Sequence, residues 1–265
     1  MTKKMFIKIT GLSFILFQIF HHPVSFAQKP SELKAEKAFG ENESLTYVLR
    51  WGPIEGGIAN TMVKRTTYQG KEVYYGRVLA KTIGLADALF KVKDIYSSYF
   101  DTATLLPYKA IRDIHEGSYV YYNEVSFFQD KNKVLSQKSG VHEVPAGILD
   151  MVSTLYYLRS MDFSRLSNGD VIKIVTFFGD EIFPFDFRYR GIEKVKTRMG
   201  KFRCYKFVPI VEPGRMFESE DDMIVWITAD KNQVPVRVEL DMLVGAVRCD
   251  LSLHSGLKHE LKTVD

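Results

Sequence analysis

The residue types that most often carry enzyme chemistry are scattered along this chain. Beyond residue 27 the histidines are His115, His142, His254 and His259. None of them forms the His-x-x-x-His or His-Glu-x-x-His spacing that brings two imidazoles to one zinc ion. A Gly-x-Ser-x-Gly nucleophile motif is absent, and so are the glycine-rich phosphate loops. We therefore expect no metal site, no bound cofactor, no serine nucleophile of this type and no nucleotide site.

Carboxylates are abundant but do not mark a site. The acidic run Glu218, Glu220, Asp221 and Asp222 could offer oxygen atoms to calcium. It lacks the alternating acids and the central glycine of an EF-hand loop, so a solvated loop is the preferred interpretation. Glycoside cleavage needs two converging carboxylates, and the spacing of the 32 acids singles out no such pair.

The chain has two cysteines, Cys204 and Cys249, both in apparent strands. An oxidising compartment would permit one disulfide, which requires Cα atoms within about 7 Å of each other. Two expected strands, 223–228 and 234–241, lie between the strands that hold the two residues, and a simple meander would keep them apart. One bridge and two buried free thiols are therefore both retained as interpretations, and the meander favours the thiols.

Alternation of apolar and polar residues, which is typical of a half-buried strand, dominates from Ser44 onward. Gly, Asn and Asp stand between the alternating runs, as turns require. The expected strands cover residues 45–51, 58–67, 72–82, 94–101, 107–116, 119–128, 133–137, 171–178, 182–189, 193–198, 201–209, 223–228, 234–241 and 246–254.

One segment has helical spacing instead. Between Pro145 and Asp162, apolar residues recur three or four positions apart, which predicts a helix over about 147–161. A shorter helical turn is expected over 84–92. We therefore predict a mainly β fold, a long curved antiparallel sheet forming a half-open or closed barrel, with one central helix packed against it. It forms a single domain over 39–256, between a polar lead (28–38) and a polar tail (257–265).

Aromatic residues are concentrated in one stretch of this pattern. The chain contains 19 Phe, 14 Tyr and 2 Trp, and residues 177–187 place phenylalanines on both faces of adjacent strands. Either both faces are covered by other elements, or one face lines a cavity for an apolar ligand. Cover is the simpler interpretation.

The N-terminus has the three parts of a secretory signal peptide. Lys3, Lys4 and Lys8 precede the apolar run 9–20, and small residues precede a cleavage site between Ala27 and Gln28. The run is shorter than the roughly 20 residues that span a bilayer. Removal of three lysines leaves 33 basic against 32 acidic side chains, so the apparent excess of positive charge disappears.

These features predict a soluble periplasmic protein without a transmembrane segment. The residue directly after the cleavage site is Gln28 and not a cysteine, so the protein is not expected to be a lipoprotein. No run of five basic residues is present, and nucleic acid is therefore not an expected partner.

A family resemblance extends over nearly the whole mature chain. The residues that carry it are Leu45-Thr46-Tyr47, Trp51-Gly52, Gly56-Gly57, Asp101, Leu105-Leu106-Pro107, Asp150, Ser153, Tyr156-Tyr157-Leu158-Arg159, Gly191-Ile192-Glu193, Thr197, Gly200, Phe202-Arg203-Cys204, Pro209, Gly214-Arg215, Trp226, Asp230, Pro235 and Gly245. In these positions the chain resembles domain of unknown function 3108, a group of exported Bacteroidetes-type proteins. The expected layout is also similar to the half-barrels of periplasmic lipoprotein carriers, which hold acyl chains in a concave face.

The resemblance implies no activity, but it directs attention to residues with functional side chains. We take Trp51, Tyr156, Arg159, Glu193 and Trp226 as candidate ligand-binding residues, and no catalytic residue is assigned. An Arg159–Glu193 ion pair that secures the helix is the structural alternative, with both tryptophans in the core. The leading functional hypothesis is a non-enzymatic binding or carrier protein for a hydrophobic, lipid-like ligand. An assembly factor of the cell envelope and an envelope glycan or lipid hydrolase are the alternatives.

Overall fold

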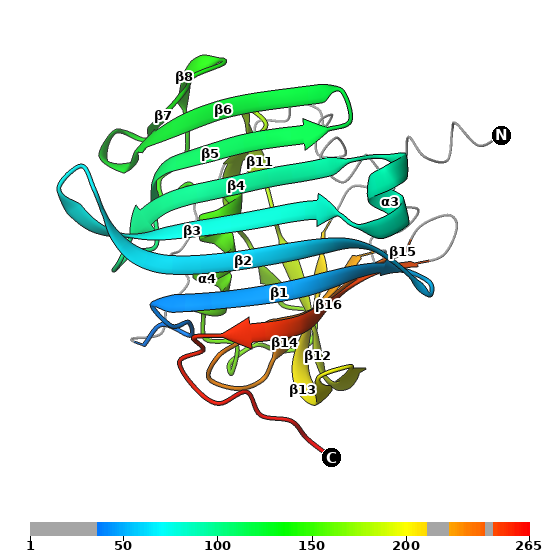
Figure 1. Cartoon of the computed structure of the whole chain (residues 1–265). Coiled ribbons are helices and arrows are strands. Elements are labelled where there is room, and N and C mark those ends of the chain that lie inside the picture. The colour runs from blue at the N-terminus through cyan, green and yellow to red at the C-terminus, as the bar shows by residue number, and fades with distance from the viewer. Residues whose placement is uncertain (1–35, 211–222, 242–245) are drawn as a thin grey trace.

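A single antiparallel sheet of 14 strands forms the frame of the molecule (Figure 1). The computed structural model describes residues 36–210, 223–241 and 246–265. The expected signal peptide with its Ala27–Gln28 site, the acidic run 218–222 and the family-like residues Gly214, Arg215 and Gly245 lie outside the described residues.

The strands follow the chain with few exceptions. Their bounds are β1 (Asn42–Trp51), β2 (Ile54–Tyr68), β3 (Lys71–Thr82), β4 (Val92–Asp101), β5 (Pro107–Glu116), β6 (Tyr119–Phe128), β7 (Lys133–Ser136), β8 (Gly140–Glu143), β9 (Val171–Ile172), β10 (Val175–Phe178), β11 (Glu181–Pro184), β12 (Phe187–Thr197), β13 (Gly200–Pro209), β14 (Met223–Thr228), β15 (Pro235–Asp241) and β16 (Ala246–Ser255). The helical segments are α3 (Gly84–Leu89), the 3-10 turn η1 (Gln129–Lys131) and α4 (Met151–Arg159).

The sheet is curved and open. Its strand order is β8-β7-β6-β5-β4-β3-β2-β1-β16-β15-β14-β13-β12-β9, and β10 and β11 form a separate two-stranded sheet. The first and last strands of the domain therefore pair with each other in the middle of the sheet. The edge strands β8 and β9 have four and two residues, which limits edge-to-edge pairing with other chains. The predicted fold class is confirmed, in its half-open form.

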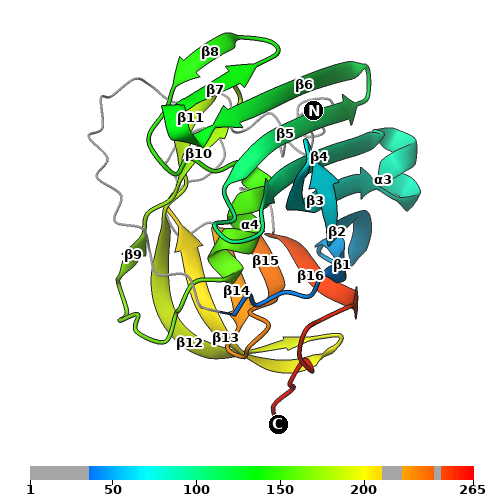
Figure 2. The same ribbon diagram turned by 90° about the vertical axis from the view of Figure 1, so that its left-hand side faces the viewer.

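Helix α4 lies inside the concave face of this sheet (Figure 2). It is shorter than the expected 147–161, because Asp150 ends the preceding extended segment and caps the helix. The Asp150 carboxylate accepts hydrogen bonds from the Val152 and Ser153 amides, and the Ser153 hydroxyl accepts one from the Asp150 amide. This reciprocal capping box fixes the N-terminus of the helix. Leu149, just before the cap, instead bridges in parallel to Thr176.

The helix fits closely because the strand beneath it has no side chain at one position. A Cβ atom at Gly76 on β3 would lie 2.8 Å from Val152 Cγ1 and 2.9 Å from Phe100 Cε1. The main core cluster is built around this contact. It contains aromatic rings from the N-terminal segment, β3, β4, α4, the segment after α4 and β13, including Phe39, Tyr74, Phe100, Tyr156, Phe163 and Phe207. The space between α4 and β3 is therefore filled by side chains.

Several expected strand boundaries differ from the structure, and two of them have a clear physical reason. The turn expected at Gly191 is a register shift inside β12, between Tyr189 and Ile192, where Gly191 has a φ of +95°. A β-bulge and a turn both favour glycine because both can require a positive φ. Only the pairing with the neighbouring strand distinguishes the two. The strand expected over 171–178 is divided into β9 and β10, which belong to different sheets.

The two cysteines are free thiols. Cys204 lies on β13 and Cys249 on β16, and β14 and β15 separate these strands in the sheet. Burial raises the pKa of each thiol to about 12. Both belong to a second apolar cluster, onto which Leu257 and Leu261 of the polar C-terminal segment also pack.

The described helices are short. None of those within residues 36–210, 223–241 and 246–265 has the length and apolar character that crossing a bilayer requires.

Candidate functional site

Arg159, at the end of α4, is a fully buried cation that ties the helix to both halves of the sheet. Its guanidinium meets the Glu43 carboxylate of β1 through two contacts of 2.5 and 2.9 Å, and both side chains are at most 1% exposed. It also donates to the carbonyl oxygens of Asn232 and Gln233, at 3.0 and 3.1 Å, in the turn between β14 and β15. Burial alone would lower the pKa of Arg159, but the Glu43 carboxylate outweighs it and holds that pKa above its usual value. The partner of Arg159 is therefore Glu43, and the expected pairing with Glu193 does not form.

Tyr156, one turn earlier on α4, lies in the main core cluster. Its ring stacks on Phe100 with centroids 5.5 Å apart and meets Phe39 edge-on at 4.9 Å. Burial raises the pKa of Tyr156 well above the usual tyrosine value.

Glu193 and Trp226 lie together on another part of the sheet. The Trp226 indole N–H donates to the Glu193 carboxylate, and Lys206 Nζ lies 3.6 Å from that carboxylate. Glu193 is in β12 and Trp226 in β14, on either side of β13. Trp226 is buried in the second apolar cluster, as its core interpretation implies.

Trp51 is half-buried at the end of β1, where it lines a surface hollow with Arg50, Pro53 and Ile54. The structure thus brings Tyr156 together with Arg159, and Glu193 together with Trp226, and leaves Trp51 separate. A common ligand site for the five residues is not formed, and a ligand role for any one of them stays a prediction.

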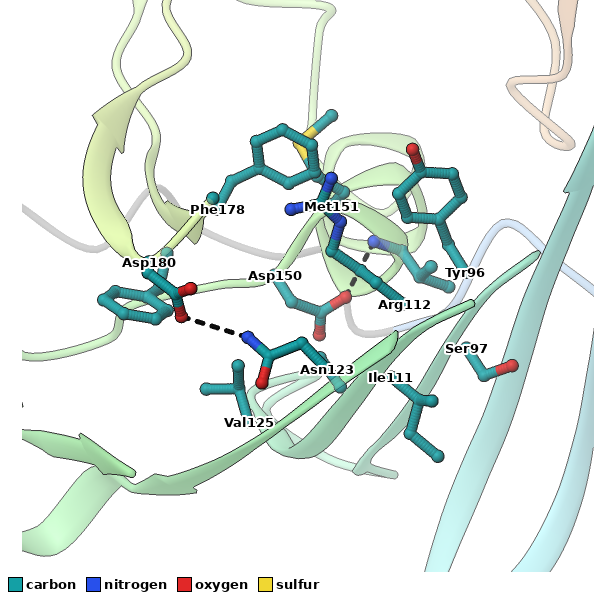
Figure 3. Close-up of a pocket in the computed structure, with 14 residues that line it drawn as sticks. Tyr96, Ser97, Ile111, Arg112, Asn123, Val125, Asp150, Met151, Phe178 and Asp180 are labelled. Carbon is teal, nitrogen blue, oxygen red and sulfur yellow. Dashed lines mark hydrogen bonds between the residues drawn. The ribbon is translucent and has the colours of Figure 1, made fainter. Parts of the chain in front are cut away.

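A different set of residues surrounds a small internal pocket. The pocket lies between the inner face of β4, β5 and β6, the N-terminus of α4 and the β10–β11 hairpin (Figure 3). It offers about 30 Å³ to water-sized molecules. Apolar lining comes from Ala110, Val125, Met151, Val152, Phe177 and Phe178, and polar lining from Tyr96, Arg112, Asn123, Asp150 and Asp180.

Arg112 on β5 is the distinctive residue of this pocket. Its guanidinium carbon lies 4.3, 5.0 and 5.8 Å from the ring centroids of Phe178, Tyr121 and Tyr96, so three aromatic faces surround the cation. Figure 3 shows its side chain reaching from β5 toward Phe178. Nε and Nη1 are buried and form no hydrogen bond with another described residue. Among the described side chains, Arg112 alone has two such buried nitrogen or oxygen atoms.

Asp150 lines the pocket but its oxygens are already engaged. One oxygen accepts the two helix amides, and the other accepts from the Ser98 hydroxyl at 2.6 Å. Burial is the dominant effect on this carboxyl and raises its pKa despite these hydrogen bonds.

Asp180 lies across the pocket, at the tip of the β10–β11 hairpin, where Gly179 and Asp180 have φ values of 64° and 66°. Two such residues make the tight turn that suits a two-residue hairpin. Its carboxylate accepts from Ser136 Oγ at 2.5 Å, Asn123 Nδ2 at 3.0 Å and Tyr121 Oη at 3.2 Å. Burial would raise the pKa of Asp180, but the hydrogen bonds outweigh it and hold that pKa below its usual value. These bonds fasten the hairpin over the pocket.

The chemistry available here is recognition by hydrogen-bond donors. The carboxylates of Asp150 and Asp180 have hydrogen-bond partners, whereas the Nε and Nη1 groups of Arg112 have no acceptor among the described residues. A carboxylate or phosphate group accepts such paired donors. Among the described residues, no group of three or more His, Cys, Asp and Glu side chains is placed to hold a metal ion.

Sequence reasoning missed Arg112, although one signal was present. Ala110, Arg112 and Ile114 alternate along β5 and so point to the same face of the sheet. The cross-strand neighbours of Arg112, which are Tyr96 and Asn123, line the pocket. A charged residue at the inward parity of a strand indicates a polar feature inside the sheet.

Solved structures with a similar fold include a β-barrel-like protein of domain of unknown function DUF1849 from Brucella abortus. It has 9% sequence identity and a TM-score of 0.53, and the match covers 86% of this chain and all of that one. A DUF1089 family protein from Pseudomonas aeruginosa gives a TM-score of 0.34 at 11% identity, covering 83% of this chain and 95% of the other. No curated protein sequence matches the chain.

The family comparison agrees with the residues that first suggested it. The model described as "Protein of unknown function (DUF3108)" matches residues 46–252, which span β1 to β16 and enclose α4 and the Arg112 pocket. The chain belongs to the DUF3108 family.

Proposed function

We propose that this chain is an exported, non-enzymatic binding protein of the periplasm. Its ligand is a lipid-like amphiphile, with an anionic head that meets Arg112 and an apolar body. The signal-peptide pattern of residues 1–27 supports export. The Arg112 pocket supports the binding role.

The observation that carries the proposal is the pair of unpartnered donors on Arg112. A buried donor without an acceptor costs about 1–3 kcal/mol, so folded proteins rarely keep two on one side chain without a use. A carboxylate or phosphate head would satisfy both N–H groups in the bidentate geometry that guanidinium groups favour.

The charges around Arg112 are compatible with an anionic head. The carboxylate of Asp180 is held by three hydrogen bonds and does not use the guanidinium. Burial raises the pKa of Asp150, so protonation of that carboxyl on ligand binding is easier than for an ordinary aspartate.

The pocket volume limits what enters without rearrangement. About 30 Å³ holds one to two water molecules, whereas pockets for whole small ligands measure about 300–1,000 Å³. The apolar body must therefore follow Phe177 and Phe178 after the β10–β11 hairpin moves outward. That hairpin is a separate two-stranded sheet, and the Asp180 bonds together with the Leu149–Thr176 bridge hold it in place.

Titration calorimetry with laurate tests the proposal. The exported protein, purified from the periplasm and delipidated, should bind laurate, and R112M should weaken binding by about tenfold or more, because a charge-assisted contact of about 1.5–3 kcal/mol is lost. Lauryl alcohol, which has the same chain without the charge, should bind both proteins equally and more weakly than laurate binds the wild type.

A matched control is available on the other face of the sheet. Arg77 lies on β3 opposite Ser97, with the opposite parity to Tyr96 and Arg112, and it does not line the pocket. R77M should leave laurate binding unchanged. Absence of laurate binding by the wild type, or equal binding by wild type and R112M, would reject the proposal.

A further inference from the structure

β1, β3 and β5 finish at one end of the sheet, on the right of Figure 1, and the segments at this end carry exposed apolar side chains. We call this set the rim patch. Its members and their exposed fractions are Ile54 (53%), Leu85 (69%), Leu89 (58%), Tyr119 (40%) and Val120 (62%). Single exposed apolar residues are ordinary, whereas a contiguous group marks a contact surface.

The three segments that carry the rim patch touch one another. The Ile83 amide, just before α3, donates to the Gly56 carbonyl at the start of β2 at 3.1 Å. On the other side, the Gly117 amide in the β5–β6 turn donates to the Lys91 carbonyl at 2.8 Å. A Cβ atom at Gly117 would lie 2.9 Å from the Phe90 ring. The β1–β2 turn, α3 and the β5–β6 turn therefore lie next to one another at this end of the sheet.

Helix α3 has no buried residue, although its sequence is largely apolar. Leu85 and Leu89 are four positions apart and so project from the same side of this short helix. These leucines do not pack against the core. Their exposure points to a partner outside the chain.

The charges beside α3 indicate the chemistry of that partner. Lys81, Lys91 and Lys93 are exposed, and none of them forms an ion pair with another described residue. The one acid of α3, Asp87, accepts a hydrogen bond from Thr82 Oγ1 at 2.9 Å. Leucines flanked by free lysines match a bilayer surface, where apolar side chains enter the headgroup–acyl boundary and ammonium groups meet lipid phosphates.

We propose that the rim patch docks the protein on a bilayer that contains anionic lipids. In the docked state Leu85 and Leu89 enter the boundary between headgroups and acyl chains, and the three lysines lie at the level of the phosphates. This proposal goes beyond ligand binding at Arg112 and rests on different residues.

Vesicle co-sedimentation of the exported protein tests the docking. Wild-type protein should pellet with vesicles of equal parts phosphatidylcholine and phosphatidylglycerol, and less with phosphatidylcholine alone. L85D/L89D should reduce partitioning by about tenfold or more, since both apolar contacts are lost and two negative charges face the lipid. K81Q/K91Q/K93Q should remove the preference for phosphatidylglycerol.

The matched control is L135D/L253D, which changes two exposed leucines (43% and 67%) on β7 and β16 toward the opposite end of the strands. This variant should sediment like the wild type. Equal sedimentation of wild type and L85D/L89D, or an equal loss in the control, would overturn the docking. So would a wild-type dimer that becomes monomeric in L85D/L89D, because a second copy would then cover the patch.

Laurate titration separates this proposal from the previous one. L85D/L89D should still bind laurate, and R112M should still sediment with vesicles, so either proposal can fail alone.

Discussion

At the scale of single residues, the most constrained group is the buried Arg159–Glu43 pair. The guanidinium serves β1 through Glu43 and the β14–β15 turn through two carbonyl oxygens. These contacts join strands that lie on both sides of the β1–β16 seam. The sequence marks Arg159 as a candidate for binding, and in the structure its guanidinium is hydrogen-bonded to other residues of the chain.

R159M should destabilise the fold strongly. The substitution leaves the Glu43 carboxylate buried without its partner, a situation that costs about 3–5 kcal/mol in the free energy of unfolding. Urea denaturation followed by circular dichroism measures this loss. E43L/R159M, which removes both charges, should recover a large part of it. A loss below about 1 kcal/mol for R159M would show that the pair does not hold the helix to the sheet.

The two carboxyls of the pocket should respond to acid in opposite directions. The folded-state pKa of Asp180 lies below the ordinary value of about 3.9, so its ionised form stabilises the fold above that value and the stabilisation is lost as the pH falls through the folded-state pKa. Burial raises the folded-state pKa of Asp150, so this carboxyl destabilises the fold at higher pH and the penalty disappears as the pH falls toward about 3.9.

Unfolding free energies of wild type, D180N and D150N from neutral to acidic pH test these signs. The advantage of wild type over D180N should shrink on acidification, whereas wild type should gain relative to D150N. Asparagine keeps the capping oxygen for α4, so D150N should fold. Parallel pH curves for the three proteins would contradict both assignments.

At the scale of elements, the fold depends on how closely α4 approaches the sheet. Gly76 is the position on β3 that permits this approach. The helix in turn places Asp150 and Val152 in the pocket wall. The β10–β11 hairpin closes the opposite side through Asp180. Helix α4 and the β10–β11 hairpin thus enclose the pocket against β4, β5 and β6, whose sequences show the usual alternation of a half-buried strand.

G76A should therefore be costly although it adds one methyl group. That methyl would lie 2.8 Å from Val152 Cγ1, and overpacking of this kind costs about 1–3 kcal/mol. G56A on β2 is the control, because its methyl would meet only Ala86 Cβ at an ordinary 3.6 Å. G56A should stay within about 0.5 kcal/mol of wild type or be slightly stabilising. Equal unfolding free energies for the two variants would mean that α4 is not seated on Gly76.

At the scale of the whole molecule, alternation predicted the fold class because almost every strand has one inward and one outward face. Contacts between residues far apart in the sequence could not be predicted from alternation. Gly191 has the chemistry of a turn, and only its neighbours in β13 make it a bulge. Arg159 needed a partner, and that partner, Glu43, is 116 residues away, whereas Glu193 is nearer in sequence. The pocket is formed by β4–β6, α4 and β10–β11. No local sequence pattern predicts that these elements lie next to one another.

Export is a prediction about the whole chain. The N-terminal pattern predicts cleavage between Ala27 and Gln28, which leaves 238 residues. Intact-mass spectrometry of protein recovered from the periplasm should give the mass of residues 28–265. A full-length mass in the cytoplasmic fraction would contradict the signal-peptide assignment.

The measurement that tests the central claim most directly is native mass spectrometry of wild type and R112M purified side by side from the periplasm. If the chain is a binding protein for an anionic amphiphile, wild type should carry an adduct that organic extraction releases as a lipid-like acid, and R112M should lose most of it. R77M, with the same substitution on the opposite face, should keep the adduct. A wild-type protein with only its own mass, which also fails to bind added laurate, would contradict the account.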